Sequence, residues 1–339
     1  MALARAFSKV AEGESLVAID LVEESKEAAG LILEHVFCCI CGPVGAVPIG
    51  TGPDFEYRVS ADQFLAMRCE KCELVYVSPR PHISELRRIY PDNYHAFSFS
   101  KERFGLVYRV RERLEAARLL RSTQGLPADA RILDVGCGDG FHLNLLRRFG
   151  LPSWNLIGVD VDERAVAAAR AQGLAVVQGT VEEAALESGS FDLVLLIATI
   201  EHVADPPSVL SATRRLLKPG GKVLIVTDNT RTLDFAIFKG RYWGGYHFPR
   251  HWCLFNRSAI ANLAATTGFE VESIRTSVSP VNWVYSIRNF LDDFNAPKPI
   301  VEFFSLASPI CLAMFTAWDA LHASLGFGAL LRVVLKRPR

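Results

Sequence analysis

Two pairs of closely spaced cysteines near the start of the sequence offer the ligands of a metal site. Cys38 and Cys41 form one C-x-x-C motif, Cys69 and Cys72 form the second, and about 27 residues separate the two motifs. Four thiolates at this spacing suit tetrahedral Zn²⁺, and a closed shell of four sulfurs leaves no open position for catalysis. We therefore predict a structural zinc site, with buried or redox-active cysteines as the alternative.

A glycine-rich turn follows an apolar segment in the middle of the chain. Residues 131–135 favour a strand, and Gly136, Gly138 and Gly140 come directly after it. The glycines permit a tight turn and a close approach of a ligand to the backbone. A helix beginning at Phe141 would point its first amides into the same crevice. This pattern predicts a cofactor-binding loop, although a plain strand-to-helix turn has the same appearance.

Two acids near this loop narrow the class of cofactor. Asp160 ends the apolar segment 156–159, about 20 residues after the last glycine, where a carboxylate can bind both hydroxyls of a ribose. Asp134 lies before the glycines in a D-x-G-x-G-x-G pattern, whereas dinucleotide-binding loops favour G-x-G-x-x-G. A carboxylate at this place favours a cofactor that carries an ammonium group.

The segment 131–229 resembles the core of the class I S-adenosylmethionine-dependent methyltransferases. Residues 132–140 match the first motif of that family, and 158–160 match its ribose-binding strand. Residues 190–194 match its fourth strand, and 216–221 match the turn before its fifth. The matches occur in the family's order over about a third of the chain.

The resemblance implies roles for individual residues. Asp134 and Gly136 would contact the methionine part of the cofactor, and Asp160 the ribose. Many relatives bind the adenine through an Asp that this chain lacks, so Thr180, Glu182 or a backbone amide would serve instead. The predicted cofactor-binding residues are Asp134, Gly136, Cys137, Gly138, Gly140, Asp160, Val161, Thr180, Val181 and Glu182.

The cysteine-rich segment also resembles a known arrangement. Residues 69–76 and 79–81 are similar to a zinc-binding region that precedes many bacterial methyltransferases of small molecules. This likeness implies a small-molecule acceptor such as a sugar or a natural product, and the apolar segment 303–318 would suit a lipid-linked one. The predicted activity is that of a transferase with S-adenosylmethionine as its cofactor and a structural zinc ion.

Aromatic, basic and glycine residues gather in the segment 240–252. It follows the fifth predicted strand, at the sheet edge where ligands bind in such folds. The composition suits a polar acceptor held by stacking and hydrogen bonds, and a surface loop whose aromatics pack on the core is the alternative. The predicted acceptor-binding residues are Tyr242, Trp243, Tyr246, His247 and Arg250.

Histidines near this segment are candidates for a general base. His202 follows the fourth predicted strand, and His251 lies near the end of the aromatic segment. An imidazole titrates near neutral pH, so both residues are predicted to be catalytic. A base is needed only for an alcohol, a phenol or an acidic carbon, and His202 could instead pack or bond to the backbone.

Alternating apolar and helical patterns predict the fold. Strands are expected at 131–135, 156–159, 175–178, 191–197, 222–227, 269–277 and 330–335. Helices are expected at 141–148, 163–172, 184–187, 207–217 and 258–266. The alternation indicates an α/β fold, and the resemblance implies a Rossmann-like seven-stranded methyltransferase sheet with helices on both faces. The cysteine segment, with β-type runs at 55–59 and 74–77, would form a small zinc-ribbon-like module.

These elements suggest four divisions of the chain. They are an N-terminal segment at 1–36, a zinc-binding module at 37–82, a helical connector at 83–125 and a methyltransferase domain at 126–339, with an apolar insertion at about 285–328. Residues 303–318 contain no charged side chain and are shorter than a membrane-spanning helix. A buried helical pair is one interpretation, and peripheral contact with a membrane is the other.

Charge and composition limit the partners. The 37 Lys and Arg residues balance the 37 Asp and Glu residues, which disfavours a nucleic-acid partner and favours a small-molecule acceptor. No signal peptide is evident, so we expect a cytoplasmic protein, or one peripheral to the inner face of the membrane. A zinc-finger RNA methyltransferase and a non-catalytic or membrane-associated binding protein are the alternatives.

Overall fold

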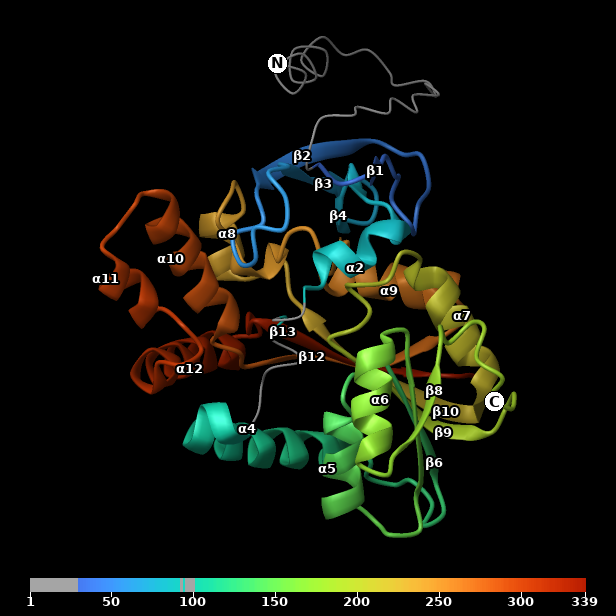
Figure 1. Cartoon of the computed structure of the whole chain (residues 1–339). Coiled ribbons are helices and arrows are strands. Elements are labelled where there is room, and N and C mark those ends of the chain that lie inside the picture. The colour runs from blue at the N-terminus through green and yellow to red at the C-terminus, as the bar shows by residue number, and fades with distance from the viewer. Residues whose placement is uncertain (1–29, 92–93, 95–100) are drawn as a thin grey trace.

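A seven-stranded mixed sheet forms the centre of the protein (Figure 1). The computed structural model describes residues 30–91, 94 and 101–339. The strands of this sheet are β6 (Arg131–Val135), β7 (Asn155–Asp160), β8 (Ala175–Gln178), β9 (Phe191–Ile197), β10 (Leu217–Asp228), β12 (Glu270–Ser277) and β13 (Leu330–Lys336). Their spatial order is β12-β13-β10-β9-β6-β7-β8, and only β13 runs antiparallel to its neighbours. The predicted α/β, Rossmann-like architecture is confirmed.

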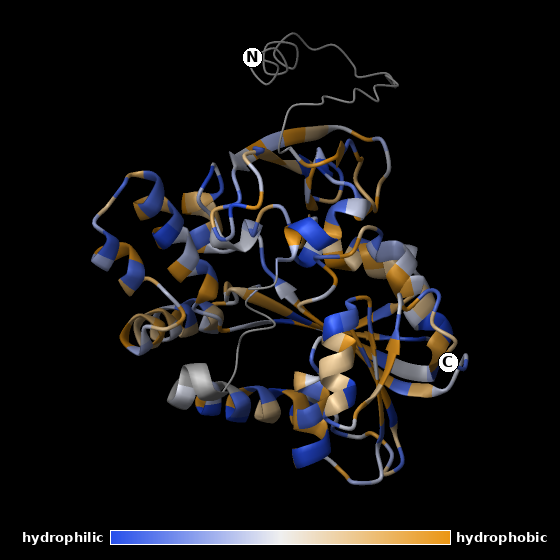
Figure 2. Ribbon diagram, viewed as in Figure 1, coloured by the Kyte–Doolittle hydropathy of each residue, from blue (hydrophilic) through white to orange (hydrophobic). Residues whose placement is uncertain are grey.

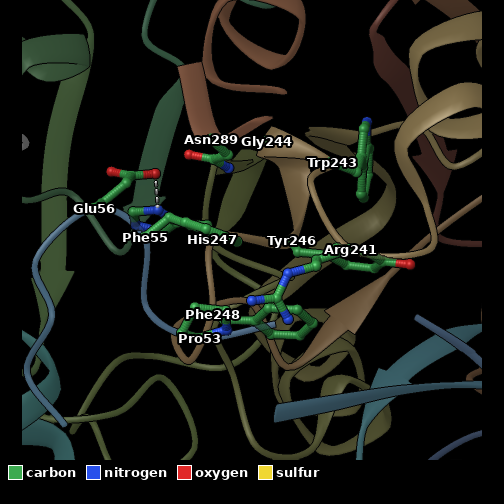
Figure 3. A pocket seen from close by; sticks show the side chains of 10 residues that line it. All are labelled: Pro53, Phe55, Glu56, Arg241, Trp243, Gly244, Tyr246, His247, Phe248 and Asn289. Carbon is green, nitrogen blue, oxygen red and sulfur yellow. Dashed lines mark hydrogen bonds and ion pairs between the residues drawn. The ribbon is translucent and has the colours of Figure 1, made fainter. Parts of the chain in front are cut away.

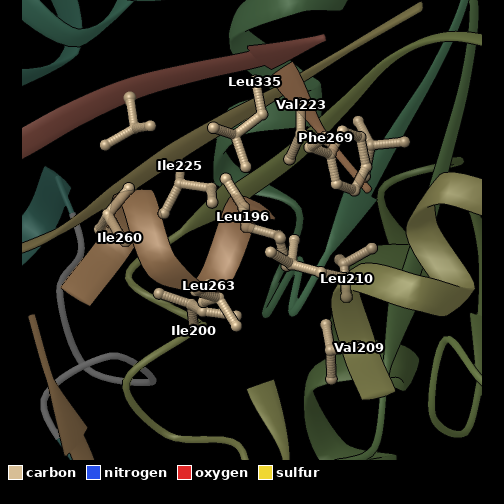
Figure 4. Close-up of a cluster of buried hydrophobic side chains, with 14 of the residues drawn as sticks. Leu196, Ile200, Val209, Leu210, Val223, Ile225, Ile260, Leu263, Phe269 and Leu335 are labelled. Atoms are coloured by element: carbon tan, nitrogen blue, oxygen red, sulfur yellow. The ribbon is translucent and has the colours of Figure 1, made fainter. Parts of the chain in front are cut away.

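Helices cover both faces of this sheet. They include α4 (Lys101–Ser122), α5 (Phe141–Phe149), α6 (Glu163–Ala171), α7 (Pro206–Leu216) and α9 (Arg257–Thr266). Along β9, Leu193 and Leu195 pack towards α4 and α5, whereas Val194 and Leu196 pack towards α7 and α9 (Figure 4). A strand covered on both faces is apolar at consecutive positions, which is why residues 191–197 are a nearly unbroken apolar run.

The cysteine-rich segment forms a second, four-stranded sheet above the central one (Figure 1). Its strands are β2 (Ala46–Gly52), β3 (Phe64–Cys69), β4 (Val75–Val77) and β11 (Cys253–Leu254). A separate pair joins β1 (Leu33–Glu34) to β5 (Arg80–Pro81), followed by η1 (Ile83–Glu85) and α2 (Leu86–Ile89). The strand β11 lies more than 170 positions further along the chain than β4 and pairs antiparallel with it. The predicted domain boundaries remain a proposal, and most of the segment 1–36 lies outside the described residues.

Three local predictions differ from the structure. Residues 55–59 form a turn rather than a strand, because the Asp54 carboxylate accepts hydrogen bonds from the amides of Glu56, Tyr57 and Val59. The segment 184–187, expected to be helical, is a bend followed by irregular chain, because four residues are too few to nucleate a helix. The strand β2 was not predicted, because Pro48, Gly50 and Gly52 interrupt its apolar pattern.

Helices between the last two strands expose an apolar surface. They are α10 (Val281–Asp293), α11 (Lys298–Phe303) and α12 (Pro309–Ser324). Ile310, Met314, Trp318 and Leu321 recur at helical spacing along α12 and are 44–67% exposed. The ribbon of α12 is largely in the hydrophobic colours of Figure 2. The expectation of a buried helical pair is therefore wrong for this face of α12. None of the described helices has the length and apolar character needed to cross a bilayer.

Between the central sheet and the module lie α8 (Leu233–Phe238) and η2 (Gly244–Tyr246). Tyr246, Phe248, Trp252 and Leu254 pack with module residues such as Phe64 in one buried cluster. The aromatic segment is therefore part of the hydrophobic core of the module. It also carries His247 and His251, two of the three histidines that were predicted to be functional.

Candidate functional site

The glycine loop connects the carboxyl end of β6 to the first turn of α5. Gly136, Gly138 and Gly140 all have positive φ angles, of 71°, 55° and 84°. A side chain at Gly136 would also approach the side chain of Thr199 to 2.6 Å. The hydroxyl of Thr199 donates to the carbonyl of Val135 at 3.0 Å, which fastens the loop after β9 to the glycine loop. Glycine is thus required here by both conformation and space.

Asp134 offers a buried carboxylate oxygen beside this loop. The side chain is 1% exposed, and its Oδ2 atom has no hydrogen-bond partner among the described residues. The imidazole of His142 lies 3.9 Å from Oδ2, beyond hydrogen-bonding distance. Burial, together with the charge of Asp160, raises the pKa of Asp134 to about 8. An ammonium group would satisfy this oxygen and favour its ionised form.

Asp160 stands at the end of β7, as the ribose-binding prediction requires. Its two carboxylate oxygens accept from the amides of Gly138 at 2.8 Å and Asp162 at 2.9 Å. Val161 follows with an apolar side chain that is 57% exposed, at the same edge of the sheet. This arrangement offers a carboxylate for hydroxyl groups next to an open apolar surface.

The loop after β8 contains the residues predicted to approach an adenine ring. Gly179 donates its amide to the carbonyl of Asp160, which brings the loop alongside the end of β7. Val181 is buried, whereas the hydroxyl of Thr180 accepts from the amide of Glu183. The adenine contact therefore remains a prediction for Thr180 and Glu182.

The four predicted zinc ligands come together in the module. The sulfur atoms of Cys38, Cys41, Cys69 and Cys72 all lie within 4.8 Å of one another. The sulfurs of Cys38 and Cys72 are 3.5 Å apart, and a hydrogen bond from Cys72 lowers the pKa of Cys38 to about 5. The remaining nearby thiol, Cys39, lies 3.8 Å from the sulfur of Cys253 instead. The set of four sulfurs fits a tetrahedral zinc ion.

Three histidines cluster at the carboxyl end of β9. The ring centres of His202 and His251 are 4.5 Å apart, and those of His251 and His247 are 5.0 Å apart. His202 follows Thr199 in the loop that is fastened to the glycine turn. The cluster therefore lies next to the predicted cofactor site.

Backbone carbonyls orient two of these rings. The Nδ1 atom of His251 is 2.8 Å from the carbonyl oxygen of Gly245, and that of His202 is 3.2 Å from the carbonyl oxygen of Arg250. A carbonyl oxygen can only accept, so each Nδ1 carries the hydrogen of the neutral ring. The Nε2 atom of each neutral ring is then the proton-accepting nitrogen. The hydroxyl of Tyr90 also lies 3.0 Å from the Nδ1 atom of His202.

Buried carboxyl groups stand behind the histidines. Burial and the nearby Asp228 raise the pKa of Glu201 to about 8, and its carboxyl accepts from the hydroxyl of Thr227. Burial raises the pKa of Asp228 to about 7, although a hydrogen bond from Asn282 opposes the shift. Asp228 lies 3.5 Å from the Nδ1 atom of His251. Groups that titrate near neutral pH are thus concentrated around these rings.

The predicted acceptor-binding residues differ in what they contact. Trp243 and Tyr246 are buried and donate to Asp234 and to the carbonyl of Lys239. Tyr242 is half-buried and donates to Asp293 at 2.9 Å. Arg250 is fully buried in an ion pair with Asp54, and the Nδ1 atom of His247 lies 2.6 Å from Glu56. Of these five residues, the structure brings His247 alone into the histidine cluster.

Two pockets border the aromatic segment, and one of them is lined by His247. One pocket is formed by the residues drawn in Figure 3, including Glu56, His247 and Asn289, and its volume of about 10 Å³ is room for about one water molecule. The second pocket has a volume of about 310 Å³ and is lined in part by Trp252. Its wall also contains Tyr76, Arg80 and Asp205.

Sequence reasoning missed the acids of the module that reach this site. Asp54 and Glu56 lie more than 190 positions from their partners Arg250 and His247. Their local signal is two acids alternating with aromatic residues in a segment that was expected to be a strand. Only the fold brings them to the histidines.

Comparisons with known proteins identify the central region. The family model described as a methyltransferase domain matches residues 102–274. Over 117 residues the chain is 38% identical to the ubiquinone biosynthesis O-methyltransferase of Xanthomonas oryzae pv. oryzae, an alignment covering 32% of this chain and 48% of that protein. The chain thus spans about half the length of the first curated relatives it matches.

A second relative and a solved structure extend the likeness. The ubiquinone biosynthesis O-methyltransferase of Pseudomonas aeruginosa is 32% identical over 181 residues, which cover 49% of this chain and 75% of that one. The structure of Haemonchus contortus phosphoethanolamine N-methyltransferase 2 in complex with S-adenosyl-L-methionine has a TM-score of 0.50 and 19% identity. That alignment covers 87% of this chain and 69% of the other, and it shows a similar fold.

Proposed function

The chain belongs to the family of S-adenosylmethionine-dependent methyltransferases, and from this premise we propose that it methylates a hydroxyl group of a small-molecule acceptor. One observation carries the choice of acceptor: histidines and buried carboxyls gather at the sheet edge beside the glycine loop. An amine can lose its proton to water, whereas an alcohol or phenol benefits from a positioned base. The names of the curated O-methyltransferases are consistent with an oxygen acceptor.

The glycine loop and its neighbours would hold the cofactor. The buried Oδ2 atom of Asp134 suits the ammonium group of the methionine part, and Asp160 suits the ribose hydroxyls. Val161 presents an exposed apolar side chain on which the adenine can lie. When bound, S-adenosylmethionine supplies an electrophilic methyl group on a positively charged sulfur.

His202 and His251 would accept the proton that the acceptor loses. Carbonyl oxygens hold the Nδ1 atom of each ring, which leaves Nε2 as the basic nitrogen of the neutral form. The ionised carboxylate of Asp228 would stabilise His251 once it is charged. The other contribution of the protein is alignment, because a methyl transfer between held partners needs little further catalysis.

We assign a structural zinc ion to the cysteine cluster. Its four sulfurs close the coordination shell. The ion would therefore hold the two C-x-x-C motifs, here called the knuckles, together rather than take part in the reaction. The knuckles pack on Phe255 and other residues of the central core. Zinc binding would therefore stabilise the aromatic segment that carries His251.

The exposed face of α12 extends the proposal to a membrane surface. Ile310, Met314, Trp318 and Leu321 form one apolar stripe, and the acid of this helix, Asp319, is buried. A Trp side chain suits the interface between headgroups and acyl chains. Peripheral binding through 303–318 would bring the site to a lipid-linked acceptor.

Transfer of label from S-adenosylmethionine into host-cell extract tests the proposal. After the reaction, the extract is separated into RNA, protein, lipid and small-molecule fractions. We expect label in the small-molecule or lipid fraction, lost with Asp160→Ala and kept with Glu187→Ala, which removes an exposed acid that pairs with Arg131. Label in RNA alone would refute the proposal and favour an RNA methyltransferase.

A further inference from the structure

A loop of the cysteine-rich module reaches into the histidine cluster. It connects β2 to β3, and the carboxylate of Asp54 shapes it by accepting from the amides of Glu56, Tyr57 and Val59 at 3.0–3.2 Å. A carboxylate that binds several successive amides fixes the backbone as a capping residue does. The position of the Glu56 side chain is therefore determined by the loop.

A buried ion pair fastens this loop to the aromatic segment. Two nitrogens of Arg250 donate to the two oxygens of Asp54 at 2.8 and 3.1 Å, and both side chains are fully buried. The same guanidinium donates to the carbonyl of Ile89 and lies over the ring of Tyr57, 4.4 Å from its centre. The planar fork of an arginine fixes orientation as well as distance. The ion pair therefore holds the loop that carries Glu56 firmly against the segment that carries His247.

Glu56 and His247 meet at this junction. The Oε1 atom of Glu56 is 2.6 Å from the Nδ1 atom of His247, and both side chains are largely buried. Burial and the charge of Arg250 lower the pKa of His247, which favours the neutral ring, and a neutral ring can donate from Nδ1 to the Glu56 carboxylate. An ionised carboxylate only accepts, so the hydrogen is on Nδ1 and the Nε2 atom has the lone pair.

The backbone at His247 is strained in a way that suits a function. Its φ and ψ angles are 39° and 41°, a left-handed conformation that costs a residue with a side chain about 1 kcal/mol or more. Its ring lies 5.0 Å from that of His251 and 5.9 Å from that of Tyr94. The strain thus places an imidazole of fixed tautomer beside the proposed base.

We propose that Glu56 is a positioning residue that the module contributes to the acceptor site, where it holds His247 in the tautomer whose Nε2 accepts a hydrogen bond from the acceptor. This inference rests on the proposed function. It implies an acceptor that carries a hydroxyl or N–H donor close to the oxygen that is methylated. An acceptor with a carbonyl or ether oxygen at that place would meet a lone pair and be rejected.

The tautomer is testable without any acceptor. Long-range ¹H–¹⁵N correlation spectra of the full chain, labelled with ¹⁵N-histidine, distinguish a protonated ring nitrogen from an unprotonated one. The His247 signals are assigned by their loss in His247→Asn. We expect Nδ1 to be protonated in the wild type and in Glu56→Gln, whose amide oxygen still accepts, and Nε2 to become protonated in Glu56→Ala. A wild-type His247 that is protonated on Nε2 would overturn the proposal.

Labelled methyl transfer into the small-molecule fraction of host-cell extract tests the consequence for the acceptor. Glu56→Ala should need about tenfold more extract for its half-maximal rate, because one hydrogen bond in the site is lost, while its affinity for S-adenosylmethionine by calorimetry is unchanged. Asp62→Asn is the matched control, since the side chain of that acid of the same loop accepts, among the described residues, from the amide of Leu31 and not from a histidine. A wild type that transfers no label contradicts the proposed function and leaves the tautomer to the spectra. An active wild type with Glu56→Ala equal to Asp62→Asn contradicts the role of Glu56.

Discussion

Replacing Arg250 with alanine should destabilise the protein more than the loss of an exposed ion pair would. The guanidinium is fully buried and donates to both oxygens of Asp54 and to the carbonyls of Ile89 and Phe248. Alanine removes these donors and leaves the Asp54 carboxylate in the core without its counter-charge. Removing one partner of a buried pair costs about 3–5 kcal/mol.

The lower end of that range applies here. Asp54 keeps its hydrogen bonds from the amides of Glu56, Tyr57 and Val59, so its charge is not wholly unsatisfied. We expect a loss of about 3 kcal/mol in the free energy of unfolding, or a fall in Tm of about 4 °C for a cooperative unit of this size. Urea unfolding followed by circular dichroism measures the first quantity, and thermal unfolding measures the second.

A matched variant separates burial from charge. Arg241 pairs with Asp293 at 3.0 Å, but both side chains are about one third exposed. Such pairs contribute about 1 kcal/mol or less because water and salt screen them. Arg241→Ala should therefore lower stability by less than a third of the Arg250→Ala effect, and equal losses would refute the argument from burial.

The ion pair between Arg250 and Asp54 also predicts how the stability of the protein depends on pH. Burial opposes ionisation of Asp54, but the hydrogen bonds and charge of Arg250 outweigh it, and the net shift of the Asp54 pKa is downward. A group with a depressed pKa in the folded state stabilises the protein above its unfolded pKa of about 3.9 and loses that contribution as the pH falls below it. The stability difference between wild type and Arg250→Ala should therefore be constant from about pH 5 to 7 and shrink below about pH 4. A difference that grows on acidification would contradict this sign.

Four further outcomes test the sites. Asp160→Ala should weaken S-adenosylmethionine binding by about tenfold or more, because hydroxyl hydrogen bonds to a charged group contribute about 1.5–3 kcal/mol; unchanged calorimetric affinity would remove the ribose assignment. Cys69→Ser should lose about one zinc per chain by metal analysis, whereas Cys137→Ser should keep it; a folded, metal-free wild type would remove the zinc site. Burial raises the pKa of Asp134 to about 8, so binding of a cationic cofactor at pH 7 should release close to one proton, seen by calorimetry in buffers of different ionisation enthalpy; release that persists above about pH 9 would contradict this origin. Trp318→Glu should abolish flotation with liposomes, and a wild type that does not float would refute membrane contact.

The cofactor loop could be predicted from sequence because its signals are local. Asp134 and the glycines lie within seven consecutive residues, and Asp160 follows at the spacing of one helix. The strand and helix periods around them are strong because both faces of the sheet are covered. At this part of the chain, the local backbone preferences and the burial pattern therefore predict the same strands and helices.

The acceptor side could be predicted only in part, because its contacts join distant segments. Arg250 looked like a substrate ligand from its neighbours, yet its guanidinium is fully engaged inside the protein. Glu56 lay in an apparent strand, since the apolar alternation of residues 55–59 does not reveal that Asp54 captures their amides. The exposed stripe on α12 was invisible for a related reason: an apolar sequence has the same composition whether it faces the core or the solvent.

The short strand β11 has a consequence for how the molecule comes apart. Through it, residues 253 and 254 complete the sheet of the cysteine-rich module, and its neighbours Trp252 and Phe255 pack on both sides of the junction. A fragment that ended after residue 82 would expose the edge of β4 and lose part of its core. The two parts should therefore melt in one cooperative transition. If the proposed zinc ion occupies the cysteine cluster, its removal by a chelator would loosen the segment that carries His251 as well, and methyl transfer would fall although the cofactor loop stays intact.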